Sequence, residues 1–335
     1  MTEDNRNITP RTDSSISRRQ EDLINRGLEL ARKINSPDQN KPAEYKYEFV
    51  RKWGSEGSED GQFNWPMGVA LDGDGNVYVA DYQGHRIQVF NSEGNFLRKW
   101  GSEGSEDGQF YRPWGVAIDN DDNVYVADTR NHRIQVFNSE GKFLRKWGSE
   151  GSEDGQFDKP AGVALDGDGN VYVTDTRNHR IQVFNSEGNF LRKWGSRGSE
   201  DGQLKPWGLA IDNDDNVYVA DWNNTDCSNN QIQFFDSQGN FLRKWGSEGS
   251  EDGQFDKPAG VALDGDGNVY VTDTRNHRIQ VFNSEGNFLR KWGSRGSEDG
   301  QFDRPYGLAI GSDGNVYVAD TGYYRIQVFK PARLT

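Results

Sequence analysis

One motif recurs six times along the chain and constrains its fold more than any other feature. It reads Pro-x-Gly-[Val/Leu]-Ala-[Leu/Ile], then a short acidic turn, then Asn-Val-Tyr-Val-[Ala/Thr]-Asp. The copies begin 46 to 52 residues apart, at Pro66, Pro113, Pro160, Pro206, Pro258 and Pro305. A nearly fixed period in this range indicates an array of similar supersecondary units, each packed on its neighbours.

Each unit is expected to form four short strands, named a to d in chain order. In the first unit they are predicted at Gly68–Asp72, Val77–Asp81, Arg86–Phe90 and Phe96–Trp100. Val, Ile, Tyr and Phe fill these segments, as pleated sheets favour, and Gly and Asn between them suit tight turns. Four-stranded units with this period predict an all-β fold, a β-propeller of six blades.

The two ends of the chain are predicted to complete one blade together. The last unit ends at Phe329 and lacks the Phe-Leu-Arg-Lys-Trp segment that forms strand d elsewhere, whereas a similar segment precedes the first unit at Phe49–Trp53. Pairing of Phe49–Trp53 with Arg325–Phe329 would close the ring and remove an open sheet edge, which otherwise invites aggregation. The propeller is assigned to residues 44–331.

The units resemble the NHL repeat. The resemblance rests on Gly-Gln-Phe-x-x-Pro-x-Gly-Val-Ala, on Asn-Val-Tyr-Val-Ala-Asp and on Asn-His-Arg-Ile-Gln-Val-Phe, and it extends over about Tyr45–Lys330. Proteins with this repeat include TRIM-NHL and Brat-like regulators, bacterial NHL-repeat proteins and a peptidyl-hydroxyglycine amidating lyase. The resemblance implies a six-bladed propeller but no single function, because activity depends on the site that a fold carries.

Residues 1–43 form a polar segment of a different kind. A loose apolar stripe predicts one short helix over about 15–35, followed by a linker. The first eleven residues lack the apolar core of a secretory leader, and no apolar run is long enough to span a membrane. A cytoplasmic location is therefore expected. A single cysteine, Cys227, argues against a disulfide framework and against a cysteine zinc site.

Differences between the units gather on one face of the predicted disc, which carries the b–c connections and the d–a loops. Large aromatic side chains follow the motif proline in alternate units, where they would either plug the central channel or contact a partner. The b–c connections carry arginines in three units and an insertion around 222–228 in the fourth. The predicted partner-binding residues are Trp114, Trp207, Tyr306, Arg130, Arg177, Arg275, Trp222, Asp226 and Tyr324.

An aspartate ends strand b and an arginine opens strand c in five units. A charge-assisted hydrogen bond across this connection would fix the hairpin, so a structural role is expected. In the fourth unit Gln231 replaces the arginine where the connection lengthens. The predicted pairs are Asp81 with Arg86, Asp128 with Arg133, Asp175 with Arg180, Asp273 with Arg278 and Asp320 with Arg325.

Metal sites are weakly indicated. The four histidines occupy one repeat position on four blades, and a zinc site needs ligands that converge on one point. They are His85, His132, His179 and His277. The acidic turn 72–76 begins like a calcium loop but continues with Val77 where that loop needs glycine. We expect no cofactor, with zinc or calcium as the alternative.

The sequence therefore favours a non-catalytic scaffold that binds a protein or peptide through its variable face. A metal-dependent lyase or lactonase-like enzyme at the central channel is the alternative. Binding of single-stranded RNA is a second alternative, which the acidic d–a loops and the net charge of -14 disfavour because phosphates require cationic partners.

Overall fold

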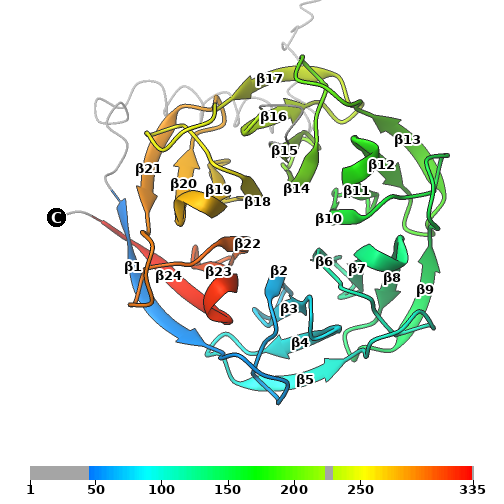
Figure 1. The fold of residues 1–335 in the computed structure, drawn as a ribbon, viewed down its shortest axis with the longest axis horizontal. Helices are drawn as coiled ribbons and strands as arrows, with labels where there is room; N and C mark the ends of the chain where they lie inside the picture. Colours follow the sequence, from blue (N-terminus) through cyan, green and yellow to red (C-terminus); the bar gives the residue numbers. More distant parts are fainter. Residues whose placement is uncertain (1–44, 223–228, 334–335) are drawn as a thin grey trace, which may run out of the picture. The chain divides into compact units, whose positions relative to one another are not determined.

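The computed structural model describes residues 45–222 and 229–333, which form a ring of six four-stranded antiparallel sheets (Figure 1). In blades one to five the strands lie in sequence order from the channel outward. The predicted all-β, six-bladed propeller is confirmed. The predicted helix over 15–35 and its linker lie outside the described residues. No helix in the described part of the chain is long and apolar enough to cross a membrane.

The strands follow the repeat closely. Blade one contains β2 (Pro66–Leu71), β3 (Val77–Asp81), β4 (Arg86–Phe90) and β5 (Phe96–Trp100). Blade two contains β6 (Val116–Ile118), β7 (Val124–Asp128), β8 (Arg133–Phe137) and β9 (Phe143–Trp147). Blade three contains β10 (Pro160–Leu165), β11 (Val171–Asp175), β12 (Arg180–Phe184) and β13 (Phe190–Trp194).

The second half of the ring repeats this order. Blade four contains β14 (Pro206–Ile211), β15 (Val217–Asp221), β16 (Gln231–Phe235) and β17 (Phe241–Trp245). Blade five contains β18 (Pro258–Leu263), β19 (Val269–Asp273), β20 (Arg278–Phe282) and β21 (Phe288–Trp292). Blade six contains β22 (Pro305–Ile310), β23 (Val316–Asp320), β24 (Arg325–Arg333) and β1 (Tyr45–Trp53).

Blade six joins the two ends of the propeller. Strand β1 pairs antiparallel with β24, with Phe49 opposite Phe329 and Trp53 opposite Ile326. The predicted ring closure is thus confirmed, and both strands extend further than the sequence indicated, from Tyr45 and to Arg333. Figure 1 shows the first and last strands side by side at the rim.

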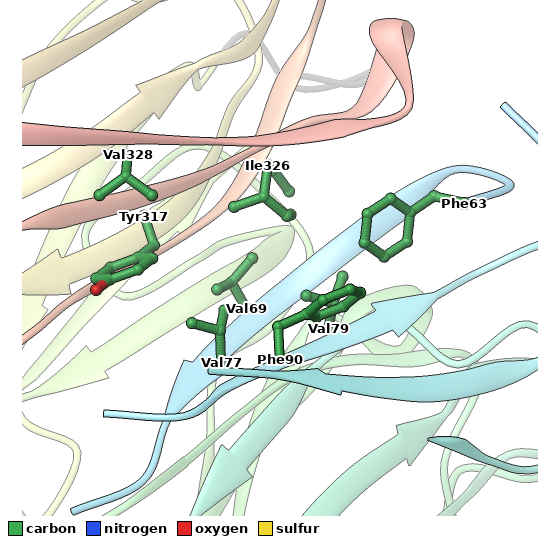
Figure 2. Packing of buried hydrophobic residues seen from close by; sticks show 9 residues of the cluster. Phe63, Val69, Val77, Val79, Phe90, Tyr317, Ile326 and Val328 are labelled. Atoms are coloured by element: carbon green, nitrogen blue, oxygen red, sulfur yellow. The ribbon is translucent and has the colours of Figure 1, made fainter. Parts of the chain in front are cut away.

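The hydrophobic core is divided into six clusters, each between two neighbouring blades. In the cluster between blades six and one, Val79 and Phe90 pack with Ile326 and Val328 (Figure 2). Phe63, from the loop that leads into blade one, completes this cluster. Strands β3 and β4 are buried along their whole length because blades cover both of their faces. Each blade therefore depends on both neighbours for its core.

The invariant glycine of the motif lets the innermost strands approach each other. The Gly68 N–H donates to the Trp114 carbonyl of the next blade at 3.0 Å. A Cβ on Gly68 would lie 2.4 Å from that oxygen, and one on Gly115 would lie 2.3 Å from the Ala161 carbonyl. Only glycine permits this backbone contact, so the narrow centre of the ring explains the motif residue.

Candidate binding face

One face of the ring carries the b–c connections and the ends of the d–a loops, and we call it the variable face. Four of the b–c connections that the structure describes in full contain a short 3₁₀ turn, visible as coiled ribbons in Figure 1. The turn η1 (Thr129–Asn131) is followed by His132 in the left-handed region, at φ 53°. This tight geometry brings the end of strand b and the start of strand c together at the face.

Four aromatic side chains meet on the variable face, and we call them the aromatic cluster: Trp114, Trp207, Trp222 and Tyr306. Trp114 contacts Trp207 edge to face at a centroid distance of 4.8 Å and Tyr306 at 5.4 Å. Trp222 lies 3.9 Å from Trp207, measured between ring centroids. All four are half-buried. The structure thus brings together four of the nine side chains that the sequence singled out for partner binding.

Three members of the aromatic cluster also line the centre of the ring. Trp114, Trp207 and Tyr306 line a cavity of about 140 Å³ that the innermost strands enclose. Because these rings keep exposed surface while packing on one another, plugging the channel and contacting a partner are compatible roles.

Arg130 and Arg177 lie beside the aromatic cluster in a second pocket, of about 250 Å³. Lys159 and Lys205 from the d–a loops also line it, together with Trp114 and Trp207. We call these six residues the cationic pocket. The two lysines are not among the site residues predicted from the sequence. One sequence pattern could have indicated them: a lysine or arginine precedes the motif proline in five of the six units.

The other three predicted partner-binding residues do not join this group. Arg275 is exposed in the b–c connection of blade five and does not line the cationic pocket. Tyr324 packs against the core cluster between blades six and one. Asp226 lies outside the described residues.

The five aspartate–arginine pairs are in contact and buried. The Arg133 Nε donates to Asp128 Oδ2 at 2.8 Å, and the same bond measures between 2.7 and 2.9 Å in the other four blades. The Arg133 guanidinium also donates to the carbonyl oxygens of Ser105 and Glu106 in the d–a loop. Each pair therefore ties the d–a loop to the start of strand c.

In blade four the buried aspartate is hydrogen-bonded by glutamines in place of an arginine. The Asp221 carboxylate accepts hydrogen bonds at 2.9 Å from the Nε2 groups of Gln231 and Gln233. It also accepts one at 2.8 Å from the Lys205 backbone N–H. Burial raises the pKa of Asp221, as it raises the pKa of the five aspartates paired with arginine, because a buried carboxylate loses its hydration.

Each of the four histidines contacts the blade that follows its own. His132 Nδ1 lies 3.2 Å from the Phe157 carbonyl oxygen, and His179 Nδ1 lies 3.1 Å from that of Leu204. In blade four Asn230 takes this place, and its Oδ1 accepts the Lys257 N–H at 3.1 Å. Each imidazole is engaged at its own blade junction, and no group of three metal-ligating side chains occurs within 45–222 and 229–333. The histidines therefore do not fit a common metal site.

Comparison with known families identifies the repeat. The NHL repeat profile matches residues 63–90, 110–137, 157–184, 255–282 and 302–329. The protein belongs to the NHL-repeat family and is a six-bladed β-propeller. The matches cover every blade except the fourth, where Leu204 stands for phenylalanine and Gln231 for arginine.

Individual relatives agree with this assignment. A stretch of 43 residues is 54% identical to the B-box type zinc finger protein ncl-1 of Caenorhabditis elegans, covering 13% of this chain and 5% of that protein. A solved structure of a protein of unknown function from Bacteroides thetaiotaomicron is similar with a TM-score of 0.69 and 18% identity, over 86% of this chain and 77% of the other. The chain thus spans a small fraction of the curated relative.

Enzymes are also among the similar folds. Virginiamycin B lyase from Staphylococcus aureus has a TM-score of 0.56 and 13% identity, over 87% of this chain and 89% of the enzyme. A proposed gluconolactonase has a TM-score of 0.61 and 14% identity, over 87% of this chain and 94% of the other. At these identities the likeness is one of fold alone.

Proposed function

We propose that this NHL-repeat propeller is a non-catalytic scaffold that binds a protein or peptide partner through its variable face. The observation that carries the proposal is the aromatic cluster, in which Trp114, Trp207 and Trp222 meet half-buried beside a cationic pocket. Tryptophan and arginine are the residues most enriched where proteins bind one another, because they bury large areas and form hydrogen bonds at their polar ends.

The location of sequence differences between blades supports the same face. The residue after the motif proline changes from Trp114 to Ala161 to Trp207 in successive blades, whereas the a–b and c–d turns on the opposite edge vary little. A uniform scaffold with one varied face is the expected arrangement for recognition by loops on a rigid fold.

The test is affinity capture with a triple variant, Trp114→Ala, Trp207→Ala and Trp222→Ala. We expect proteins bound by the wild-type chain to be lost, because truncation of central interface aromatics costs about 2 kcal/mol or more each. Quantitative mass spectrometry compares the two captures. Recovery of the same proteins in the same amounts by a folded triple variant would refute the proposal.

A matched control separates loss of binding from loss of structure. Leu97, Leu144 and Leu242 are exposed on the outermost strands, far from the channel in the strand order. Alanine at these three sites removes comparable apolar surface from the rim, and we expect partner capture to be unchanged. Circular dichroism melting of both variants establishes that each ring is folded.

The metal-dependent lyase or lactonase alternative rests on the similar folds. It requires metal in near-stoichiometric amount in the purified protein and loss of turnover on chelation, which elemental analysis and an assay with EDTA measure. The RNA alternative requires retention of single-stranded RNA on a filter at low salt, falling steeply as salt rises.

A further inference from the structure

The cationic pocket gathers positive charge on a chain whose net charge is -14. Arg130 and Arg177 come from the b–c connections of blades two and three, and Lys159 and Lys205 from the loops that enter blades three and four. Among the described residues, no carboxylate lines the pocket. Blades two and three and the loop that enters blade four therefore present four cations to one volume of about 250 Å³.

Three of these four cations are not neutralised by ion pairs with the described residues. The side chains of Arg130, Arg177 and Lys159 form no salt bridge with any described residue. Burial lowers the pKa of Lys159, and the charges of Arg130 and Arg177 lower it further, against smaller opposite effects of Asp158 and Glu150. The charges repel one another across the pocket, and a bound anion would relieve this repulsion.

A buried hydroxyl in the pocket wall has no partner. Thr176 is 3% exposed, lines the pocket, and its Oγ1 has no hydrogen-bond partner among the described residues. Thr274 lies at the same position of a segment with identical sequence, and its Oγ1 donates to the Pro305 carbonyl at 2.8 Å. An unsatisfied buried donor is uncommon and calls for a ligand or another explanation. An oxyanion would accept this hydrogen bond.

We propose that the cationic pocket binds an oxyanion of the partner peptide, either a carboxylate or a phosphorylated side chain. Arginine guanidinium groups suit such planar or tetrahedral oxyanions because they donate paired hydrogen bonds. Trp114 and Trp207 flank the cations and provide apolar surface for the rest of the residue that carries the anion. This assignment rests on the proposed function and adds the chemistry that the partner must carry.

The distribution of charge favours a peptide anion over a nucleic acid strand. Single-stranded nucleic acids need cations that follow several successive phosphates. Elsewhere on this face Arg304 Nη2 lies 3.4 Å from Asp303 Oδ2 and the Arg112 guanidinium lies over the ring of Tyr82, whereas Arg275 is exposed on blade five, apart from the pocket. The four cations that line one common volume are those of the cationic pocket, which suits a single anionic group.

The test measures fluorescence anisotropy of labelled Gly-Ser peptides with the full chain. One peptide carries several glutamates, one a phosphoserine and one a free C-terminal carboxylate, and an amidated neutral peptide is the reference. We expect at least one anionic peptide to bind about tenfold more tightly than the reference. Equal affinity for all four peptides would overturn the proposal, as would tighter binding of oligouridine than of every peptide.

Matched variants establish where the peptide binds. We expect the double variant Arg130→Gln, Arg177→Gln to raise the Kd about tenfold. The control Arg295→Gln, Arg304→Gln removes the same charge at the junction of blades five and six and should leave the Kd within about twofold. An equal loss in both variants would mean non-specific attraction and would overturn the proposal.

A third pair of variants tests the hydroxyl without a change of charge. Thr176→Val should weaken binding of the best anionic peptide by about threefold or more, whereas Thr274→Val should not. No effect of Thr176→Val together with no effect of the arginine variant would refute the pocket assignment. If partner capture is then still lost in the Trp114, Trp207 and Trp222 variant, the proposed function stands and only the oxyanion assignment fails.

Discussion

Phe49 in the first strand faces Phe329 in the last, with ring centroids 6.1 Å apart and ring planes at 76°. Two residues 280 positions apart in the sequence thus share one blade and one core cluster. Tyr47, also in β1, stacks on Trp292 of blade five at a centroid distance of 4.1 Å. Strand β1 therefore pairs with β24 to complete blade six, and it also packs against blade five.

Removal of this strand should open the ring. A chain that begins at Gly54 lacks β1 and leaves β24 as an unpaired edge. We expect aggregation and a loss of unfolding free energy of at least about 3–5 kcal/mol, because three partly buried aromatic side chains, Tyr47, Phe49 and Trp53, are lost together. A chain that begins at Tyr45 is the control. Urea unfolding and size-exclusion chromatography compare them, and equal stability of the two chains would contradict the closure.

Loss of a buried arginine should cost far more than loss of an exposed lysine. Arg278→Ala leaves Asp273, which is fully buried, without its ion pair, and we expect the free energy of unfolding to fall by about 3–5 kcal/mol. The control Lys291→Ala removes an exposed ion pair with Asp252 in the same blade and should cost about 0–1 kcal/mol. Chemical denaturation measures both, and similar values would argue against a structural role of the buried pair.

Arg278→Gln should be milder than Arg278→Ala. Blade four already combines Asp221 with Gln231, whose Nε2 donates to the carboxylate. A glutamine at position 278 can supply the same donor to Asp273, so we expect it to recover part of the lost stability. Chemical denaturation compares the two variants. If the glutamine variant is no more stable than the alanine variant, glutamine does not replace arginine as a donor to Asp273.

Asp221 should make the stability of the protein depend on pH. Burial raises its pKa in the folded state above the ordinary value of 3.8, so the folded chain binds a proton more readily than the unfolded chain. Stability from this group is therefore greatest at low pH and is lost as pH rises from about 3.8 through the folded pKa. In Asp221→Asn this loss should be absent, and the difference in unfolding free energy between the variant and the wild type should move in favour of the variant as pH increases. Denaturation series at several pH values measure it, and parallel pH profiles would contradict the assignment.

The motif glycine should not tolerate even alanine. In Gly115→Ala the new Cβ would meet the Ala161 carbonyl at 2.3 Å, and we expect a loss of about 1–3 kcal/mol as the innermost strands separate. Gly167→Ala is the control, because nothing lies within 4 Å of a Cβ there. Thermal melting distinguishes them; a Gly115→Ala protein as stable as the control would show that the centre of the ring can expand.

The repeat predicted the fold because its signals are local. The period, the turn residues and the missing strand d after Phe329 are all readable along the chain, and they predicted the pairing with Phe49–Trp53. The sequence also located Trp114, Trp207 and Trp222 on one face, because the strand order alone decides which end of each blade they occupy.

The cationic pocket could not be predicted in the same way. Lys159 lies next to Arg130 only because two blades meet at a particular angle, and no pattern within one repeat encodes that angle. Thr176 and Thr274 show the same limit. Their segments are identical in sequence, yet only the Thr274 hydroxyl donates a hydrogen bond to a described residue. The difference comes from the blade that follows each segment.

The division of the core among blade junctions has a consequence for how such a chain folds and evolves. Val79 and Phe90 gain their burial from Ile326 and Val328, residues of a different repeat. The cooperative unit is thus the interface between two repeats. A single repeat excised from the chain would contain half of each of two interfaces and no complete one. Loss or gain of a single repeat would change the angle between blades at every interface of the closed ring. A protein with fewer or more repeats would therefore fold only if all of its interfaces accept the new angle.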